Sequence, residues 1–221
     1  MAGRVPRIRA QARAIAREHK HAPATLVDKG IELALTGNDP LGFECFRAAP
    51  KAVALMSPAQ IQRLLPVLSG WCSTDCFGSF ISGVAWRQGV LTDQHILAWT
   101  RSEHLWTRRA ALVSTVPLNQ PARGATAPRG EARRTLAVCE RLIDDREDMI
   151  VKGLSWALRV LAVKDPEAVV AFVDKHRERL AARVIRETNN KLRTGLKNPK
   201  KAKAAKPHKR PPTRAKSARK P

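Results

Sequence analysis

The feature that most constrains the fold is a helical period in the apolar residues, which recurs along most of the chain. The segment Ser57-Pro58-Ala59-Gln60 has the pattern of a capping box with proline at the first helical position. It is followed by Ile61, Leu64, Leu65 and Leu68, an i, i+3, i+4, i+7 stripe typical of an amphipathic helix. Sustained alternation and Asn-Gly hairpin turns, which would indicate strands, do not occur in the sequence. The pattern therefore predicts an all-α protein.

Two further helix starts, Asp39-Pro40 and Asp165-Pro166, follow the same logic as the first. Helices of similar length in succession favour an α-solenoid, a stack of helix pairs whose concave, basic face would fit a duplex. The 35-residue interval between Trp71 and Trp106 is compatible with such repeats, although a compact irregular helical domain would also produce it. We expect helices over 7–20, 24–36, 40–50, 58–69, 73–88, 93–100, 104–116, 129–144, 149–163, 166–176 and 178–194.

Two segments interrupt this pattern. Residues 117–130 contain three prolines and two glycines and are predicted to form a loop. Residues 196–221 carry 11 Lys/Arg, five Pro and no acidic residue, so they cannot bury enough apolar surface to fold. We therefore expect one folded domain over 1–195 and a disordered basic tail, which either adds attraction to phosphates or only aids solubility.

The charge balance points to a polyanionic partner. With 41 Lys+Arg against 19 Asp+Glu, the formal net charge is +22, which favours nucleic acid first and an acidic membrane surface second. No apolar run is long enough for a membrane span, and Met1 to Lys20 lacks the apolar core of a signal peptide, so we expect a cytoplasmic protein. The four cysteines form no Cys-x-x-Cys pair, and buried thiols in a reducing compartment are expected instead of a zinc site.

Trp156 lies on an unexpected face of its predicted helix, 149–163. The apolar stripe of that helix is on the opposite side, and Trp156 falls between Lys152 and Arg159. Such an aromatic side chain could touch a sugar or base while its basic neighbours hold phosphates. The alternative, which the local pattern slightly favours, is that Trp156 packs against the next repeat.

Asp75 is similarly placed in the predicted helix 73–88, on the side away from the apolar stripe. Trp71 lies one turn earlier on the same face if the helix extends back to it, but a cap at Ser73 is the preferred start. A carboxylate near an indole, both away from the core, suits a site for a cationic ligand. The more common explanation is a first-turn acid that favours the helix dipole.

Arg108 and Arg109 lie in the helix 104–116, which is apolar nearly all round and should be buried. Adjacent helical positions point 100° apart, so the two arginines cannot share one polar stripe. At least one should emerge into a groove or an ion pair. A phosphate clamp and a structural salt bridge between repeats are equally compatible with this pattern.

Three segments carry a family resemblance: Trp71-Cys72-Ser73-Thr74-Asp75, Leu105 to Ala110, and Val151 to Arg159. In this order and at these intervals they resemble the AlkD-type family of DNA alkylation repair glycosylases, built from HEAT-like repeats. The resemblance covers roughly 40–190. The aromatic-rich N-terminal segment of the family is not recognisable, and the residues before 40 would form a shortened or different first repeat.

The resemblance implies a DNA glycosylase for cationic lesions such as 7-methylguanine and 3-methyladenine in duplex DNA. This hydrolysis needs no cofactor or metal, and we expect a monomer. The resemblance places the catalytic residues at Trp71, Asp75 and Trp156, with the carboxylate stabilising an oxocarbenium-like sugar. Arg109 would anchor a phosphate, and Lys152 and Arg159 could hold flanking phosphates; we add Arg108 as a further candidate.

Two other classes of protein explain the same charge and helical stack. One is a non-catalytic helical-repeat module that binds distorted or branched DNA, and the other is a scaffold for RNA or protein.

Overall fold

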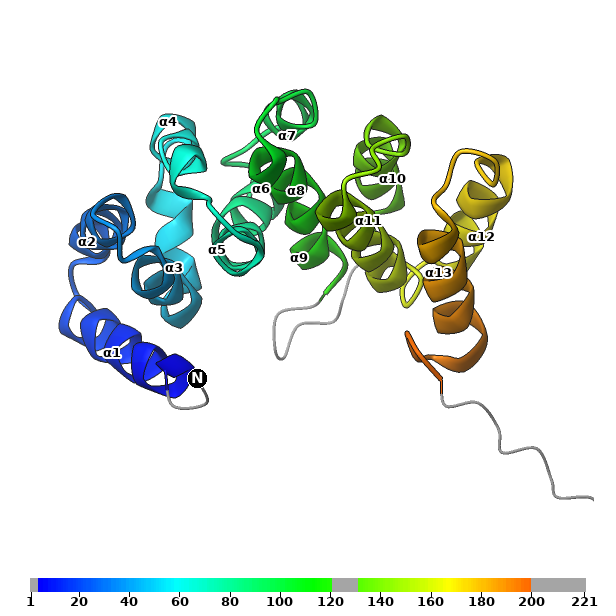
Figure 1. The fold of residues 1–221 in the computed structure, drawn as a ribbon. Helices are drawn as coiled ribbons and strands as arrows, with labels where there is room; N and C mark the ends of the chain where they lie inside the picture. The colour runs from blue at the N-terminus through cyan, green and yellow to red at the C-terminus, as the bar shows by residue number, and fades with distance from the viewer. Residues whose placement is uncertain (1–3, 121–130, 200–221) are drawn as a thin grey trace, which may run out of the picture.

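The computed structural model describes residues 4–120 and 131–199. Within these ranges the chain is helical throughout, with no strand, which confirms the predicted fold class. The helices form two layers that curve into an arch (Figure 1). The fold is thus an α-solenoid of HEAT-like helix pairs.

The inner layer lines the concave underside of the arch in Figure 1 and follows the chain from one repeat to the next. Each inner helix packs against its successor, as expected for a stack in which a repeat contacts only its neighbours. The inner helices are α3 (Asp39–Ala48), α5 (Trp71–Phe77), α8 (Leu105–Ser114), α11 (Asp148–Leu161) and α13 (Ala182–Thr194). The outer helices are α2 (Pro23–Leu35), α4 (Pro58–Gln62), α7 (Asp93–Trp99), α10 (Ala132–Arg141) and α12 (Pro166–Lys175).

The remaining elements complete the two ends and the corners of the stack. Helix α1 packs against α3 at the N-terminal end. Short helices extend α5 and α8 or connect the layers. These elements are α1 (Arg4–Glu18), η1 (Pro50–Leu55), η2 (Leu65–Val67), η3 (Gly78–Ser82), α6 (Gly83–Arg87) and α9 (Val116–Asn119).

Two predicted helix starts are confirmed with their capping bonds. Ser57 and Gln60 form the reciprocal capping box at α4. The Asp165 side chain accepts a bond from the Ala168 amide at the start of α12. Helix α3 begins at Asp39, but its N-cap is Asn38, which makes no side-chain capping bond.

Other boundaries differ from the prediction for local reasons. The helix expected over 58–69 ends at Gln62, because Pro66 supplies no amide hydrogen to continue it. The chain goes on as the 3-10 turn η2, which contains Pro66. Helix α5 begins at Trp71 with Gly70 as its N-cap, so the predicted cap at Ser73 is wrong. The helix expected over 73–88 is interrupted by the π-helical turn η3, which joins α5 to α6.

The predicted loop 117–130 is partly helical, since α9 covers Val116–Asn119. Residues 121–130 lie outside the described residues, and so do residues 200–221 of the predicted tail. The first part of that tail, 196–199, is described, and the side-chain amide of Asn190 in α13 donates a hydrogen bond to the carbonyl of Lys197.

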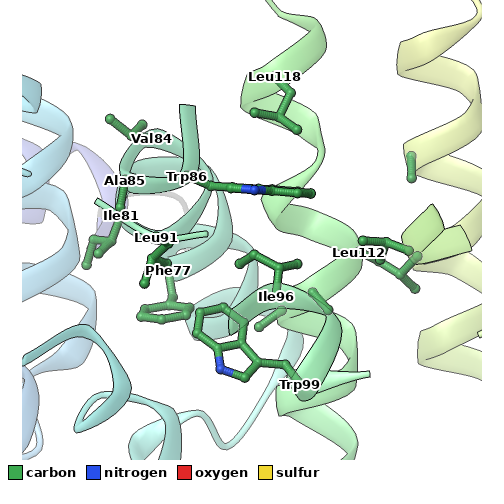
Figure 2. Packing of buried hydrophobic residues seen from close by; sticks show 14 of the residues in the cluster. Phe77, Ile81, Val84, Ala85, Trp86, Leu91, Ile96, Trp99, Leu112 and Leu118 are labelled. Atoms are coloured by element: carbon green, nitrogen blue, oxygen red, sulfur yellow. The ribbon is translucent and has the colours of Figure 1, made fainter. Parts of the chain in front are cut away.

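The core between α5, α7 and α8 fixes the central repeat. Phe77 and Trp99 lie with ring centroids 6.0 Å apart, and Trp86 extends toward Leu118 (Figure 2). The indole nitrogen of Trp86 donates to Asp93 at 2.9 Å, which satisfies its polar group at the edge of the core. This packing holds α5 and α8 in a fixed relation, on which the site depends.

The cysteines only partly match the expectation of buried thiols, because Cys45 and Cys139 are buried whereas Cys72 is exposed. Burial raises the pKa of the Cys45 thiol to about 11. No group of three metal-binding side chains gathers in 4–120 or 131–199. Within the same ranges, none of the helices has the length and apolar character needed to cross a membrane.

Candidate functional site

A pocket of about 320 Å³ opens between α5, α8, α11 and the segment that follows α13. Five of the seven predicted site residues line it, although they come from three different helices. The lining residues are Trp71, Arg109, Met149, Lys152, Trp156, Arg159 and Lys197. The stack therefore brings both predicted tryptophans and three predicted cations to one place.

Trp71 and Asp75 lie one turn apart on α5 because the helix begins at Trp71. The Trp71 side chain is 59% exposed, which is unusual for so large an apolar group in a folded domain. It lines the pocket together with Trp156, which is half-buried. Two indole faces at a basic pocket suit a flat or cationic ligand.

Asp75 is held by Arg109 in a two-pronged ion pair. The guanidinium Nε and Nη2 atoms donate to the two carboxylate oxygens at 2.9 and 3.0 Å, and Nη1 donates to the carbonyl of Met149. Arg109 is 5% exposed, so each of its guanidinium nitrogens is engaged inside the protein. Asp75 is not among the pocket-lining residues, but its side chain is 21% exposed beside them.

The electrostatics of this pair combine two opposing effects. Burial raises the pKa of the Asp75 carboxyl above its usual value, and the hydrogen bonds and positive charge of Arg109 oppose that rise. The pair is reinforced by geometry, since a bidentate arginine fixes both the position and the plane of a carboxylate.

Glycines allow the helices that carry this pair to approach closely. A Cβ atom at Gly78 would lie 2.5 Å from Cγ1 of Val113, so only glycine permits the observed distance between η3 and α8. At Gly153, a Cβ atom would lie 3.2 Å from Cδ1 of Leu112, so α11 also lies close to α8, but here the neighbouring atom is a side-chain end that can shift. These contacts place Asp75, Arg109 and the Met149 carbonyl within bonding distance.

The cations of α11 are paired with acids at the rim. Lys152 lies 2.7 Å from Asp148, which also accepts from Arg183 of α13 at 2.8 Å. Arg159 donates to the hydroxyl of Ser155 at 3.2 Å. Bonds within the protein thus hold the cationic side chains of α11 in place at the rim of the pocket.

Arg108 is placed away from the pocket. Its Nε donates to Asp145 at 2.9 Å, and its Nη1 donates to the carbonyls of Ser102 and Glu103. These bonds connect the start of α8 to the turn after α10. For Arg108 the structure thus shows a salt bridge between repeats, one of the two predicted alternatives, and we leave this residue out of the proposed site.

Sequence reasoning missed Lys197 and Glu187. Lys197 falls in the predicted tail, 196–221, but it lines the pocket. Glu187 is 5% exposed on the buried side of α13, where the helical period would place an apolar residue next to Val184 and Thr188. That single acid on an apolar stripe was a signal available in the sequence.

A larger cavity, about 750 Å³, lies between α4, α7 and α8. Its lining includes His95 and His104 but no carboxylate, lysine or arginine. Of these two, the smaller pocket is the better candidate because it combines the indoles of Trp71 and Trp156 with the charged groups of α8 and α11.

A curved stack of helix pairs with two indoles and several cations on one pocket, and a carboxylate beside it, defines a helical-repeat protein built for a polyanionic ligand. The sequence profile of the DNA alkylation repair enzyme family matches residues 2–192, and the chain belongs to this family. The protein is thus an enzyme of DNA alkylation repair. The match includes the N-terminal residues that the resemblance over 40–190 left out. Searches of curated proteins and of solved structures gave no match.

Proposed function

We propose that the protein is a monofunctional DNA glycosylase, which hydrolyses the N-glycosidic bond of cationic alkylated purines of the 7-methylguanine and 3-methyladenine type in duplex DNA. The observation that carries the proposal is the convergence of Trp71 and Trp156 on one pocket beside the oriented carboxylate of Asp75. Membership of the DNA alkylation repair enzyme family supports the substrate class.

The chemistry matches these groups. Alkylation of a purine ring nitrogen makes the base cationic, so the C1′–N bond can break without protonation and its electron pair neutralises the leaving base. The sugar is left as an oxocarbenium ion, which the Asp75 carboxylate stabilises. A water then adds to C1′ and loses its proton to the carboxylate or to solvent, which gives an abasic sugar and a free base.

The tryptophans would stabilise the positive charge on both sides of the breaking bond. A cation over an indole face is worth roughly 0.5–2 kcal/mol, depending on how far it is desolvated. Trp71 offers an exposed face from α5 and Trp156 faces the same pocket from α11. This arrangement fits recognition of a lesion at the surface of the duplex, without the deep pocket that base flipping requires.

Asp75 retains acceptor capacity for this role. Each carboxylate oxygen can accept about two hydrogen bonds, and Arg109 takes one on each. In this arrangement Arg109 acts on the DNA indirectly, by positioning Asp75. The geometry favours that role over the phosphate contact that the resemblance implies, because all three guanidinium nitrogens already have protein acceptors.

Lys152 and Lys197 each form an ion pair with a carboxylate, Asp148 and Glu187, which holds both side chains at the rim of the pocket. We propose that Lys152 and Arg159 contact phosphates, that the protein acts as a monomer, and that it works in the cytoplasm on DNA without a cofactor.

The test is incubation of the protein with methylated duplex DNA, followed by chromatographic identification of the released base. Asp75→Asn should retain duplex affinity within about threefold and abolish release, because the amide keeps the size but loses the charge. Asp174→Asn, which removes a 61% exposed acid from the outer helix α12, is the matched control and should release base at the wild-type rate.

A second candidate is a non-catalytic module that binds distorted DNA. It is favoured by the engagement of both Asp75 oxygens by Arg109, which would suit a purely structural ion pair. Tight binding of damaged duplex by the wild type with no base released would establish this candidate in place of the glycosylase.

A further inference from the structure

The segment that follows α13 turns back toward the pocket. Gly195 ends the helix with φ +72°, a left-handed conformation that favours glycine. The side-chain Nδ2 of Asn190 then donates to the Lys197 carbonyl at 3.1 Å, and Nζ of Lys191 donates to the Gly195 carbonyl at 2.7 Å. These bonds fix Lys197 at the rim, where its side chain lines the pocket.

Glu187 lies beneath two of the pocket cations. It accepts from the Ser155 hydroxyl at 2.6 Å, and its carboxylate lies 3.4 Å from Nζ of Lys197 and 3.9 Å from Nε of Arg159. Burial alone would raise the pKa of Glu187, but the Ser155 bond and the nearby Lys197 hold it below the usual value. The buried carboxylate therefore stays charged and anchors a lysine and an arginine from different segments.

Both anchored cations keep donors free. Nε of Arg159 bonds to Ser155, whereas neither Nη atom has a hydrogen-bond partner among the residues that the structure describes. The Lys197 side chain is 43% exposed, and only one of its three N–H groups is needed for Glu187. A guanidinium fork beside an ammonium is a donor set that matches the oxygens of a phosphate.

We propose that Lys197 and Arg159, held by Glu187, form a clamp for one phosphate of the DNA strand that carries the lesion. The clamp rests on the proposed function and adds to it a residue beyond the last helix. Fixing the two cations before DNA binds lowers the loss of side-chain freedom on binding. It would hold the sugar of the damaged nucleotide against Asp75 from the side of α11 and α13.

The clamp is tested by binding, independently of base release. The probe is a fluorescein-labelled duplex with one uncleavable abasic-site analogue, compared with the undamaged duplex and titrated at several salt concentrations. Lys197→Met is compared with Lys175→Met, which removes the same charge from the outer helix α12, where the side chain is 71% exposed. Glu187→Gln is the third variant, since its amide oxygen can still accept from Ser155.

For the abasic duplex, Lys197→Met should lower the slope of log affinity against log salt by about 1, and Lys175→Met should leave it nearly unchanged. Glu187→Gln should keep or raise low-salt affinity, because a negative charge is removed, but should lower the preference for the abasic duplex about fivefold. Equal slopes for the two lysine variants would overturn the clamp, as would an unchanged preference in Glu187→Gln.

The two proposals fail separately. If the wild type releases no base from methylated DNA but the slopes differ as expected, the glycosylase is wrong and the clamp stands. If base is released and the lysine variants behave alike, the clamp alone is wrong. Should Glu187→Gln not fold, which its thermal unfolding curve would show, the comparison of the two lysine variants still decides.

Discussion

Replacement of Arg109 by methionine separates a positioning role for this arginine from a phosphate contact. Methionine fills much of the buried volume but removes the donors to Asp75 and to the Met149 carbonyl. Loss of one partner from a buried ion pair typically destabilises by about 3–5 kcal/mol. Because the Asp75 side chain is 21% exposed and can be hydrated, the lower end, about 3 kcal/mol, is expected.

The loss of free energy of unfolding is measured by urea denaturation and the activity by single-turnover base release. We expect release to slow by about 100-fold, because a carboxylate displaced by about 1 Å no longer faces the sugar. Duplex affinity and its salt slope should change little, since the guanidinium is 5% exposed. In the double variant with Asp75→Asn, the two stability losses should fall well short of adding, because both changes remove one interaction.

A destabilisation below about 1 kcal/mol, together with a salt slope lowered by about 1, would refute this reasoning. That result would mean that Arg109 leaves Asp75 and binds a phosphate when DNA is present. Arg109→Lys is the companion variant, because it retains the charge but cannot form the two-pronged pair with Asp75. If Arg109 positions Asp75, this variant should recover little base release. If Arg109 instead binds a phosphate, it should recover most of the duplex affinity.

Three further predictions concern the glycines of the helix contacts, the ionisation of Asp75 and the basic tail. Gly78→Ala should lower the free energy of unfolding by about 1–3 kcal/mol and slow base release, because its Cβ would overlap Val113. Gly153→Ala should be nearly neutral, because the nearest atom is the end of a leucine side chain. Thermal unfolding of both variants checks these expectations. The rate of base release, corrected for spontaneous loss, should fall on acidification at a higher pH than an ordinary aspartate would give, because burial raises the pKa of Asp75 and the ionised form is needed. Arg109→Met should move this fall to still higher pH, because it removes the groups that oppose the rise in pKa. A pH profile that Arg109→Met leaves unchanged would contradict the assignment. Deletion of residues 200–221, which carry ten of the Lys/Arg of the chain, should lower the salt slope of duplex binding without changing the single-turnover rate at saturating protein.

Helix identity was predictable because it depends on near neighbours. The 3.6-residue period and the Ser57 and Asp165 caps located most helices within a few residues. Where the prediction was wrong, a local feature had been given too little weight: Pro66 shortened α4, and a π turn lies within the helix expected over 73–88. Local rules did not place Trp71 and Asp75 on one helix face, because they favoured a cap at Ser73 over the observed start at Trp71.

The composition and the helical period of this chain determined by themselves that it would be a basic, all-α repeat protein with aromatic and acidic residues off its apolar stripes. Only the tertiary structure decided which of those residues meet. Arg109 reaches Asp75 while Arg108 braces Asp145, and Lys197 reaches Glu187 across the end of α13. The reason is that such pairs depend on how closely whole helices approach, which Gly78 and the packed core set together, and a period read along one helix carries no information about that distance.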